Sequence, residues 1–309
     1  MPIKPMISII LPVRNEGDRI ARTLQSIADN RITDCELEFV VVDDASDVPL
    51  SAELPVSAPR AVLRVLRLEQ QAGVPGARNY GARAAAGDIL FITDAHVEFS
   101  RGWDVEVFRH LDDGRILGAT ICDTVSSFRG YGCSLIVPFM GTQWNREKPA
   151  GGTPNIQIAS AAGTVLPRAL FEKLGGYDSG MRLYGGAEPE FSVRAWLSGA
   201  EIVSVPELHI HHRFKTKPEI ERFLTDLKPH MLHNNLRFGL LYLSELACLQ
   251  MLRYYAVLYP EFIREAVSQV EAGDFRERRA ALEASFEHDL SWFIRRFSVL
   301  DQAGAEILL

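Results

Sequence analysis

Cysteine is scarce in this sequence. The 309 residues contain four cysteines, and no two of them form a CxxC pair. In a chain of this length, such sparse and scattered cysteines are typical of reduced thiols in a cytosolic protein. The cysteine content therefore predicts a cytoplasmic protein.

A long uninterrupted apolar run is also absent. Residues 236–259 are the most apolar region, but Arg237, Glu245 and Arg253 interrupt it. These charges argue against a membrane span. We predict a buried or partner-facing helix there, with a membrane-surface or oligomer contact as the alternative. The run Ile7–Val13 lacks the length and the cleavage site of a signal peptide, so we predict that it forms a first core strand.

Positive charge is in deficit. Lys and Arg number 33 against 40 Asp and Glu, which gives a net charge of -7 at pH 7. General nucleic-acid binding needs a basic surface, so this balance argues against a nucleic-acid partner. The net charge does not exclude a local basic pocket that binds a diphosphate. The apolar share of 47% is that of an ordinary globular protein with a full core.

Apolar strands and amphipathic helices alternate in the first hundred residues. Helices are predicted where apolar residues recur every three or four positions, and strands where apolar runs end in polar residues. Strands that helices cover on both faces describe an α/β fold with a doubly wound, mostly parallel sheet. The predicted strands are residues 7–13, 37–42, 62–68 and 89–93, and the predicted helices are 16–30 and 76–86.

The composition changes near residue 217. Residues 114–206 are less regular and rich in Gly and Pro, with a helix predicted at 188–198 and a short strand at 202–205. From Pro218 onward glycine becomes rare and helical patterns dominate. We therefore predict a domain over residues 1–216 and a helical region over 217–309, with helices at 219–227, 236–259, 261–270 and 276–297.

Polar residues gather where the predicted strands end. In doubly wound sheets, ligands bind beyond the carboxyl ends of the strands. The strand ends therefore predict a binding site. The residues there are Arg14 and Glu16 after the first strand, Asp43 and Asp44 after the second, and Asp94 and His96 after the fourth.

Asp94 and His96 are candidate metal ligands. In extended backbone, residues two apart point to the same side, so this carboxylate and imidazole could meet one divalent cation. The alternative is an N-cap aspartate and a surface histidine. His209, His211 and His212 offer more imidazoles. Alternation puts the first two on one face and the third on the other, so spacing alone leaves the choice among them open.

Asp43, Asp44, Arg14 and Arg78 are candidate nucleotide contacts. A carboxylate accepts hydrogen bonds from a base or a ribose hydroxyl, and an arginine stacks on a base or pairs with phosphate. A helix N-terminus near Gly76 would add N–H groups for an anion. The alternatives are a turn-forming Asp44 and a surface ion pair for Arg78.

Two carboxylates follow the glycine pair at residues 185–186. Glu188 and Glu190 are candidate catalytic residues, because a carboxylate can act as a general base and the glycines permit close approach to a ligand. The alternative is the first turn of a helix, where glutamate interacts favourably with the helix dipole.

Taken in order, these segments resemble the nucleotide-sugar half of glycosyltransferase family 2 and its relatives with the GT-A fold. The segments are residues 8–16 (SIILPVRNE), 40–44 (VVVDD), 76–79 (GARN) and 94–96 (DAH). The DxH form is similar to that of the polypeptide N-acetylgalactosaminyltransferases. So are residues 161–166 (AAGTVL), 171–178 (FEKLGGYD), 184–196 (YGGAEPEFSVRAW) and 212–215 (HRFK).

The resemblance implies a metal-dependent glycosyltransferase with a UDP-sugar donor. Its cation would commonly be Mn²⁺, with Mg²⁺ as the alternative. By position, Asp94, His96 and His212 would bind the metal. The residues expected to contact the nucleotide sugar are Pro12, Arg14, Glu16, Asp43, Asp44, Arg78 and Asp94.

The sequence departs from the family pattern at Ala187. The polypeptide N-acetylgalactosaminyltransferases have a Glu there, whereas Glu188 falls where inverting family 2 enzymes carry their catalytic base. The resemblance therefore leaves retention or inversion open. A degenerate nucleotide-sugar-binding protein is one alternative, and a sugar nucleotidyltransferase is another, although residues 11–15 lack the Gly-rich basic loop of the latter.

The acceptor stays open among a sugar, a peptide, a lipid and a small molecule. The resemblance ends near residue 215. We predict that the helical region 217–309 shapes the acceptor side or forms a homo-oligomer contact.

Overall fold

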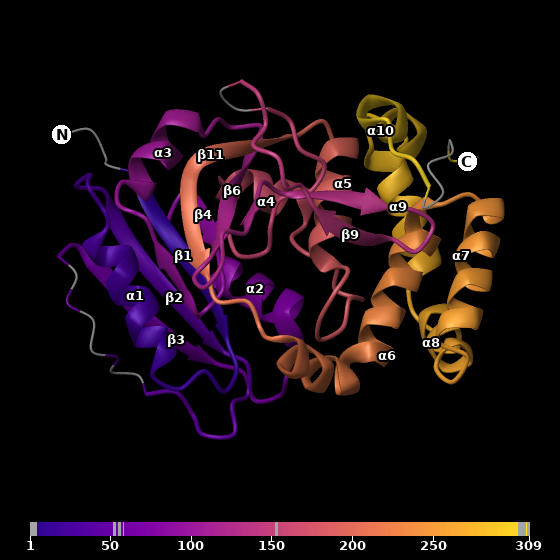
Figure 1. Ribbon diagram of the computed structural model, residues 1–309, viewed down its shortest axis with the longest axis horizontal. Coiled ribbons are helices and arrows are strands. Elements are labelled where there is room, and N and C mark those ends of the chain that lie inside the picture. Colours follow the sequence, from indigo (N-terminus) through magenta and orange to yellow (C-terminus); the bar gives the residue numbers. More distant parts are fainter. Residues whose placement is uncertain are drawn as a thin grey trace.

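One curled, mostly parallel sheet lies at the centre of the fold. The computed structural model describes residues 5–51, 54, 57, 59–151, 154–301 and 307. The strand order is β3-β2-β1-β4-β10-β6-β11-β5, with β7 paired to β6. Figure 1 shows this sheet at the end of the molecule opposite the C-terminal helices. Its strands are β1 Met6–Val13, β2 Glu36–Asp43, β3 Ala61–Arg67, β4 Ile89–Ile92, β5 Val97–Phe99, β6 Arg115–Asp123, β7 Arg129–Gly130, β10 Thr164–Pro167 and β11 Glu201–His212.

The N-terminal strands pair in parallel with their neighbours in the sheet. β1 lies between β2 and β4, and β2 pairs with β3, all in parallel register. β10 then enters antiparallel between β4 and β6, and β11 pairs in parallel with β6. A separate hairpin consists of β8 Cys133–Ile136 and β9 Gly141–Trp144. The predicted α/β architecture is confirmed.

Alternate residues of each central strand face two different hydrophobic clusters. In β1, Ile7, Ile9 and Leu11 pack with α1 Arg19–Asp29 and α3 Trp103–His110. Ile10 belongs to the other cluster, which includes α2 Gly73–Ala84, α4 Arg168–Leu174 and α5 Ala187–Leu197. Because neighbouring strand residues point to opposite faces, apolar residues at every position place helices on both sides of the sheet.

The first C-terminal helix is longer than predicted. The sequence predicted helices at 219–227 and 236–259, whereas the structure has α6 Lys217–Tyr242 and α7 Glu245–Leu258. Pro229 lies inside α6 and does not end it. A capping box formed by Thr216 and Glu219 starts α6, and Ser244 starts α7 by accepting a hydrogen bond from the Ala247 N–H. No helix in the described ranges has the length and apolar character needed to cross a bilayer.

The prediction of one helix over residues 276–297 was wrong. The structure has two helices there, α9 Phe275–Ser285 and α10 Leu290–Phe297, after α8 Ile263–Glu271. The Asp289 carboxylate accepts a hydrogen bond from the Trp292 N–H, so it caps a new helix. The strand predicted at 202–205 is also longer, since β11 continues to His212 through a β-bulge between Val205 and His209.

The sheet and the C-terminal helices share buried apolar contacts. A single hydrophobic cluster includes Ile10 of β1, Phe191 of α5, Phe238 of α6 and Phe293 of α10. The hydrophobic core therefore continues across residue 216, the position just before α6 begins. The division into domains at 216/217 stays a prediction.

Glu190 lies in the interior rather than at a ligand surface, which corrects its predicted catalytic role. Its two carboxylate oxygens each accept a hydrogen bond of 2.8 Å from Arg194, one turn further along α5. The hydroxyl of Tyr242 on α6 donates a third, at 2.6 Å. Glu190 is fully buried. Its helical phase turns it away from the side on which Glu188 is found, so its carboxylate balances the buried Arg194 charge.

Glu190→Gln should destabilise the fold, because it leaves the Arg194 guanidinium buried without its counter-charge. We expect the free energy of unfolding to fall by about 3–5 kcal/mol, as for other broken buried ion pairs. Urea denaturation followed by circular dichroism measures this. Unchanged stability together with lost activity would instead restore a catalytic role.

A buried histidine on α6 makes stability depend on pH. His233 Nε2 donates to the Gly180 carbonyl, 3.1 Å away, so the ring is held with its hydrogen on Nε2. Burial, reinforced by the charge of Arg182, lowers the pKa of His233 to about 4. An unfolded histidine titrates near pH 6.5. Between these two values the unfolded chain therefore binds more protons than the folded one.

Lowering the pH from about 6.5 toward 4 should therefore reduce the free energy of unfolding, by about 2 kcal/mol at pH 5 from this group. His233→Gln keeps a side-chain N–H but does not titrate, so its stability should depend less on pH over the same range. Urea denaturation of both proteins at pH 7 and pH 5 tests this. Equal pH dependence in the two proteins would show that His233 is not responsible.

Candidate metal centre and donor site

The sheet brings Asp94, His96 and His212 together. Asp94 and His96 lie in the short connection between β4 and β5, just beyond the end of β4. His212 is the last residue of β11 and lies opposite Val97 of β5 in antiparallel register. The strand pairing therefore positions His212 beside His96.

The three side chains offer converging ligand atoms. The Nε2 atoms of His96 and His212 are 3.2 Å apart, and Nε2 of His212 lies 3.6 Å from Oδ2 of Asp94. One ligand atom from each residue lies within 4.8 Å of the other two. Sequence spacing had left the histidine ligand open, and this geometry selects His212.

These residues fit a divalent cation. The Nε2 atoms of His96 and His212 lie close enough for both to bind one cation. A ligand carboxylate must also be ionised. Burial alone would raise the pKa of Asp94, but the hydrogen bond from His212 and the charge of Arg78 outweigh it and hold that pKa well below its usual range. Carboxylate and imidazole ligands do not select one metal.

His209 and His211 lie outside this group. Nε2 of His211 is 3.0 Å from the hydroxyl of Ser100, on the opposite side of β11 from His212. Burial, with the charge of Arg129, lowers the pKa of His209. The predicted alternative of a metal pair formed by His209 and His211 is therefore not supported.

Arg78 connects the metal ligands to Glu188. It projects from α2 and is almost fully buried. One terminal nitrogen lies 2.5 Å from Oε1 of Glu188, and the other lies 3.1 Å from Oδ1 of Asp94. The second nitrogen also donates to the Ala161 carbonyl at 3.1 Å. Instead of a surface ion pair, Arg78 forms a buried bridge between two carboxylates.

Asp43 and Asp44 are both buried and already hydrogen-bonded. The Asp43 carboxylate accepts from the N–H groups of Ser46 and Leu50 and pairs with Arg67 at 2.5 Å. It therefore holds the turn after β2. That role differs from the predicted nucleotide contact.

The Asp44 carboxylate accepts hydrogen bonds from the backbone N–H groups of Ala72 and Gly73, at 2.6 and 2.9 Å. The helix that was predicted to start near Gly76 starts at Gly73. The Asp44 carboxylate thus accepts hydrogen bonds from N–H groups at the start of this helix, where the sequence had predicted a bound anion. Burial raises the pKa of this carboxyl group.

Glu16 lies next to a metal-ligand candidate. Oε1 of Glu16 is 3.2 Å from Nδ1 of His96. Burial opposes ionisation of Glu16, but the contact with His96 outweighs it and lowers the pKa. A carboxylate at the second ring nitrogen orients a ligand histidine.

The two other residues predicted near the end of β1 lie beside β2. Pro12 lies beside Val42 in the β1–β2 register, and Arg14 donates to the Asp44 carbonyl at 2.8 Å.

A cavity of about 880 Å³ opens beside this centre. Arg78, Asp94, Glu188 and His212 line one part of it, together with Lys215. Glu190 is absent from its walls, whereas α6 and α7 both contribute to them. The cavity residues that sequence reasoning missed include the aromatic residues Phe139, Trp144, Phe223, Tyr254 and Tyr255. Their spacing carries no signal, because they come from the hairpin and from helices far along the chain.

The comparisons with known proteins show which family the chain belongs to. The family model for glycosyl transferase family 2 matches residues 8–175, more than half of the chain. Polypeptide N-acetylgalactosaminyltransferase 3 of Drosophila melanogaster is 28% identical over 237 residues, which are 69% of this chain and 35% of that protein. Polypeptide N-acetylgalactosaminyltransferase 4 of Mus musculus is 26% identical over 314 residues, which are 94% and 51%. The chain therefore spans a third to a half of the length of these relatives.

A solved structure shows the same fold. GalNAc-T7, crystallised with UDP, GalNAc and Mn²⁺, superposes with a TM-score of 0.68 over 96% of this chain and 57% of that one, at 19% sequence identity. The resemblance to the polypeptide N-acetylgalactosaminyltransferases, including the Asp-x-His segment, is confirmed. The chain belongs to glycosyl transferase family 2 and has the GT-A fold.

Proposed function

We propose that this protein is a metal-dependent glycosyltransferase that moves a sugar from a UDP-sugar to an acceptor hydroxyl. The convergence of Asp94, His96 and His212 beside a cavity lined by Arg78 and Glu188 is the observation that carries the proposal. Family membership and the names of the relatives support a nucleotide-sugar donor. The Mn²⁺ in GalNAc-T7 supports Mn²⁺ as the cation, with Mg²⁺ as the alternative.

The residues of the centre have distinct roles in this proposal. Asp94, His96 and His212 would hold the cation, which when bound neutralises charge on the departing diphosphate. Lys215 lines the same cavity and would add a second positive charge near the phosphates. Arg78 is already committed to Asp94 and Glu188, so it would hold their relative position.

Glu188 is the candidate that would orient or deprotonate the acceptor. It lies in the first turn of α5, its side chain is 20% exposed, and it lines the cavity. Ala187, where the sequence departs from the family pattern, is buried and carries no acid group. Glu188 is thus the carboxylate that α5 presents to a bound acceptor.

The identity of the acceptor is open, but the residues that line the cavity indicate which acceptors to test first. Its wall on α6 and α7 is aromatic and apolar, with Phe223, Tyr254 and Tyr255 among its residues. The relatives are named for polypeptide acceptors, so a Ser- or Thr-containing peptide is the first acceptor to test. A cytoplasmic location and a homo-oligomer stay predictions.

A nucleotide-sugar-binding protein without transfer activity is the second candidate, because Ala187 carries no carboxylate at the point where the sequence departs from the family pattern. It predicts donor binding with neither hydrolysis nor transfer. Assays of donor hydrolysis and of sugar transfer therefore separate it from the transferase.

His212→Ala should abolish tight Mn²⁺ binding, because it removes one of three protein ligands. His211→Ala is the matched control, since the adjacent imidazole contacts Ser100 instead. We expect at least about a tenfold loss of Mn²⁺ affinity for His212→Ala and little change for the control. Isothermal titration calorimetry measures both affinities, and equal losses would reject the assignment of His212.

Wild-type protein should hydrolyse one UDP-sugar slowly in the presence of Mn²⁺, and chelation should stop this. A screen of nucleotide sugars by UDP release identifies the donor without knowledge of the acceptor.

With an acceptor found, Glu188→Gln should lower kcat by about 100-fold or more, because the amide cannot take a proton. Binding of Mn²⁺ and UDP should persist.

The binding-protein candidate gains support if UDP-sugars bind but no donor is ever consumed. Full transfer activity in Glu188→Gln would remove Glu188 from the mechanism while leaving the metal centre in place.

A further inference from the structure

The segment between α4 and α5 has no regular secondary structure of its own, yet it carries part of the cavity wall. Tyr184, Gly185 and Gly186 line the cavity, and Glu188 follows two residues later. Both glycines have positive φ, at 84° and 75°, so the chain turns sharply just before α5. Whatever holds this segment therefore also sets where Glu188 lies.

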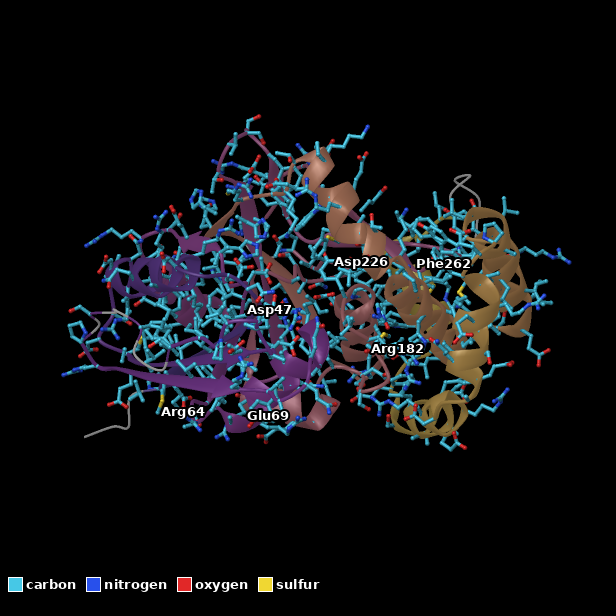
Figure 2. The ribbon with its side chains drawn as sticks, turned by 90° about the horizontal axis from the view of Figure 1, so that it is seen from below. Asp47, Arg64, Glu69, Arg182, Asp226 and Phe262 are labelled. Atoms are coloured by element: carbon cyan, nitrogen blue, oxygen red, sulfur yellow. The ribbon has the colours of Figure 1, made fainter. Side chains whose placement is uncertain are left out.

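The side-chain amide of Asn234 on α6 lies within hydrogen-bond distance of four backbone groups of this segment. Its Oδ1 accepts from the Arg182 N–H at 2.7 Å. Its Nδ2 lies 2.6 Å from the Arg182 carbonyl, 3.2 Å from that of Tyr184 and 2.7 Å from that of Gly185. Asn234 is fully buried, so its amide must find its hydrogen-bond partners within the protein, and these backbone groups supply them. Figure 2 shows Arg182 where the segment meets the C-terminal helices.

Two neighbours on α6 hold the start of the same segment. Arg237 forms a buried ion pair with Asp178, with Nε 2.6 Å from Oδ1. His233 donates to the Gly180 carbonyl. α6 therefore contacts the segment from its beginning to the residues just before α5.

The other side of the segment rests on α2. The Leu183 carbonyl accepts a hydrogen bond of 2.8 Å from the Val74 N–H. A Cβ at Gly73 would come within 2.2 Å of the Leu183 Cα, so the two backbones are in direct contact. α2 also carries Arg78, the partner of Glu188. The segment is thus fixed between α6 and the helix that anchors the charged bridge.

We propose that Asn234 is a positioning residue that holds the 182–186 segment so that Glu188 meets Arg78 and faces the bound acceptor. This role rests on the proposed transferase function. It makes α6 a structural part of the catalytic site as well as a wall of the cavity. The asparagine amide offers two N–H donors and one carbonyl acceptor at the end of a short side chain.

The hydrogen bonds and the packing of Asn234 can be separated by substitution. Asn234→Asp keeps the size of the side chain and its acceptor oxygen, but it loses both amide hydrogens and puts a carboxylate against carbonyl oxygens. Asn234→Ala leaves all four backbone groups without their partner. Both variants should let the segment move, and neither touches Asp94, His96 or His212.

The first measurement does not depend on turnover. Hydrogen–deuterium exchange should show protection of the Arg182 amide in the wild-type protein. In Asn234→Ala it should exchange about tenfold faster or more, because its acceptor is gone. Leu241→Ala is the control, since it removes a buried apolar side chain from the same helix, and it should lower Tm without raising exchange at Arg182.

The second measurement is kinetic. With the donor found by the screen above, kcat should fall about 10- to 100-fold in both Asn234 variants, the cost of misplacing a catalytic group by about 1 Å. Binding of UDP with Mn²⁺ should stay unchanged, because its ligands lie elsewhere. Leu241→Ala should retain its kcat below its Tm.

The outcomes are distinct. Unchanged exchange at Arg182, or full kcat in Asn234→Asp, overturns the positioning role. An equal loss of kcat in Leu241→Ala also overturns it, since general destabilisation would then explain the result. If the wild-type protein consumes no nucleotide sugar, the proposed function fails, while the exchange comparison still decides whether Asn234 holds the segment.

Discussion

The candidate site depends on the antiparallel register of two short strands at the edge of the sheet. β11 pairs with β5 so that His212 lies opposite Val97, and the adjacent His96 then comes within 3.2 Å of an imidazole 116 positions away along the chain. A shift of one residue would turn the other face of β11 inward. His211, whose ring contacts Ser100, would then replace His212. The β-bulge between Val205 and His209 lies upstream, where it resets the alternation of β11.

Buried arginines connect the parts of the fold that this register brings together. Arg78 bridges Asp94 and Glu188, Arg194 pairs with Glu190, and Arg237 pairs with Asp178. A buried charge is costly unless a counter-charge meets it. Arg78 and Arg237 therefore tie together segments that lie far apart in the chain, whereas Arg194 and Glu190 pair within α5. Through Arg237 and Asn234, the C-terminal helices belong to this network. They support the segment that leads to Glu188 as well as closing the cavity.

The strands and the Asp-x-His element could be predicted because their signals are local. Apolar runs that end in polar residues marked β1, β2 and β4, and the polar ends met where parallel strands expose them. Helix boundaries after residue 217 were less predictable. A capping aspartate at 289 divides one helical pattern into two helices, while Pro229 failed to divide another. Capping and tertiary packing outweigh helical periodicity at such points.

The sequence by itself determined the α/β alternation, the family and the residue types available for a cation and a diphosphate. Spacing left three neighbouring histidines open and the family resemblance pointed to His212, but the tertiary structure decided that His212 lies beside Asp94. Only the tertiary structure decided which of two neighbouring glutamates faces the cavity. Glu188 and Glu190 lie two positions apart, but the helix turns each to a different side. One lines the cavity and the other is enclosed by Arg194 and Tyr242. The reason is that strand pairing and helix packing orient side chains through contacts between segments far apart in the chain, which short-range spacing does not encode.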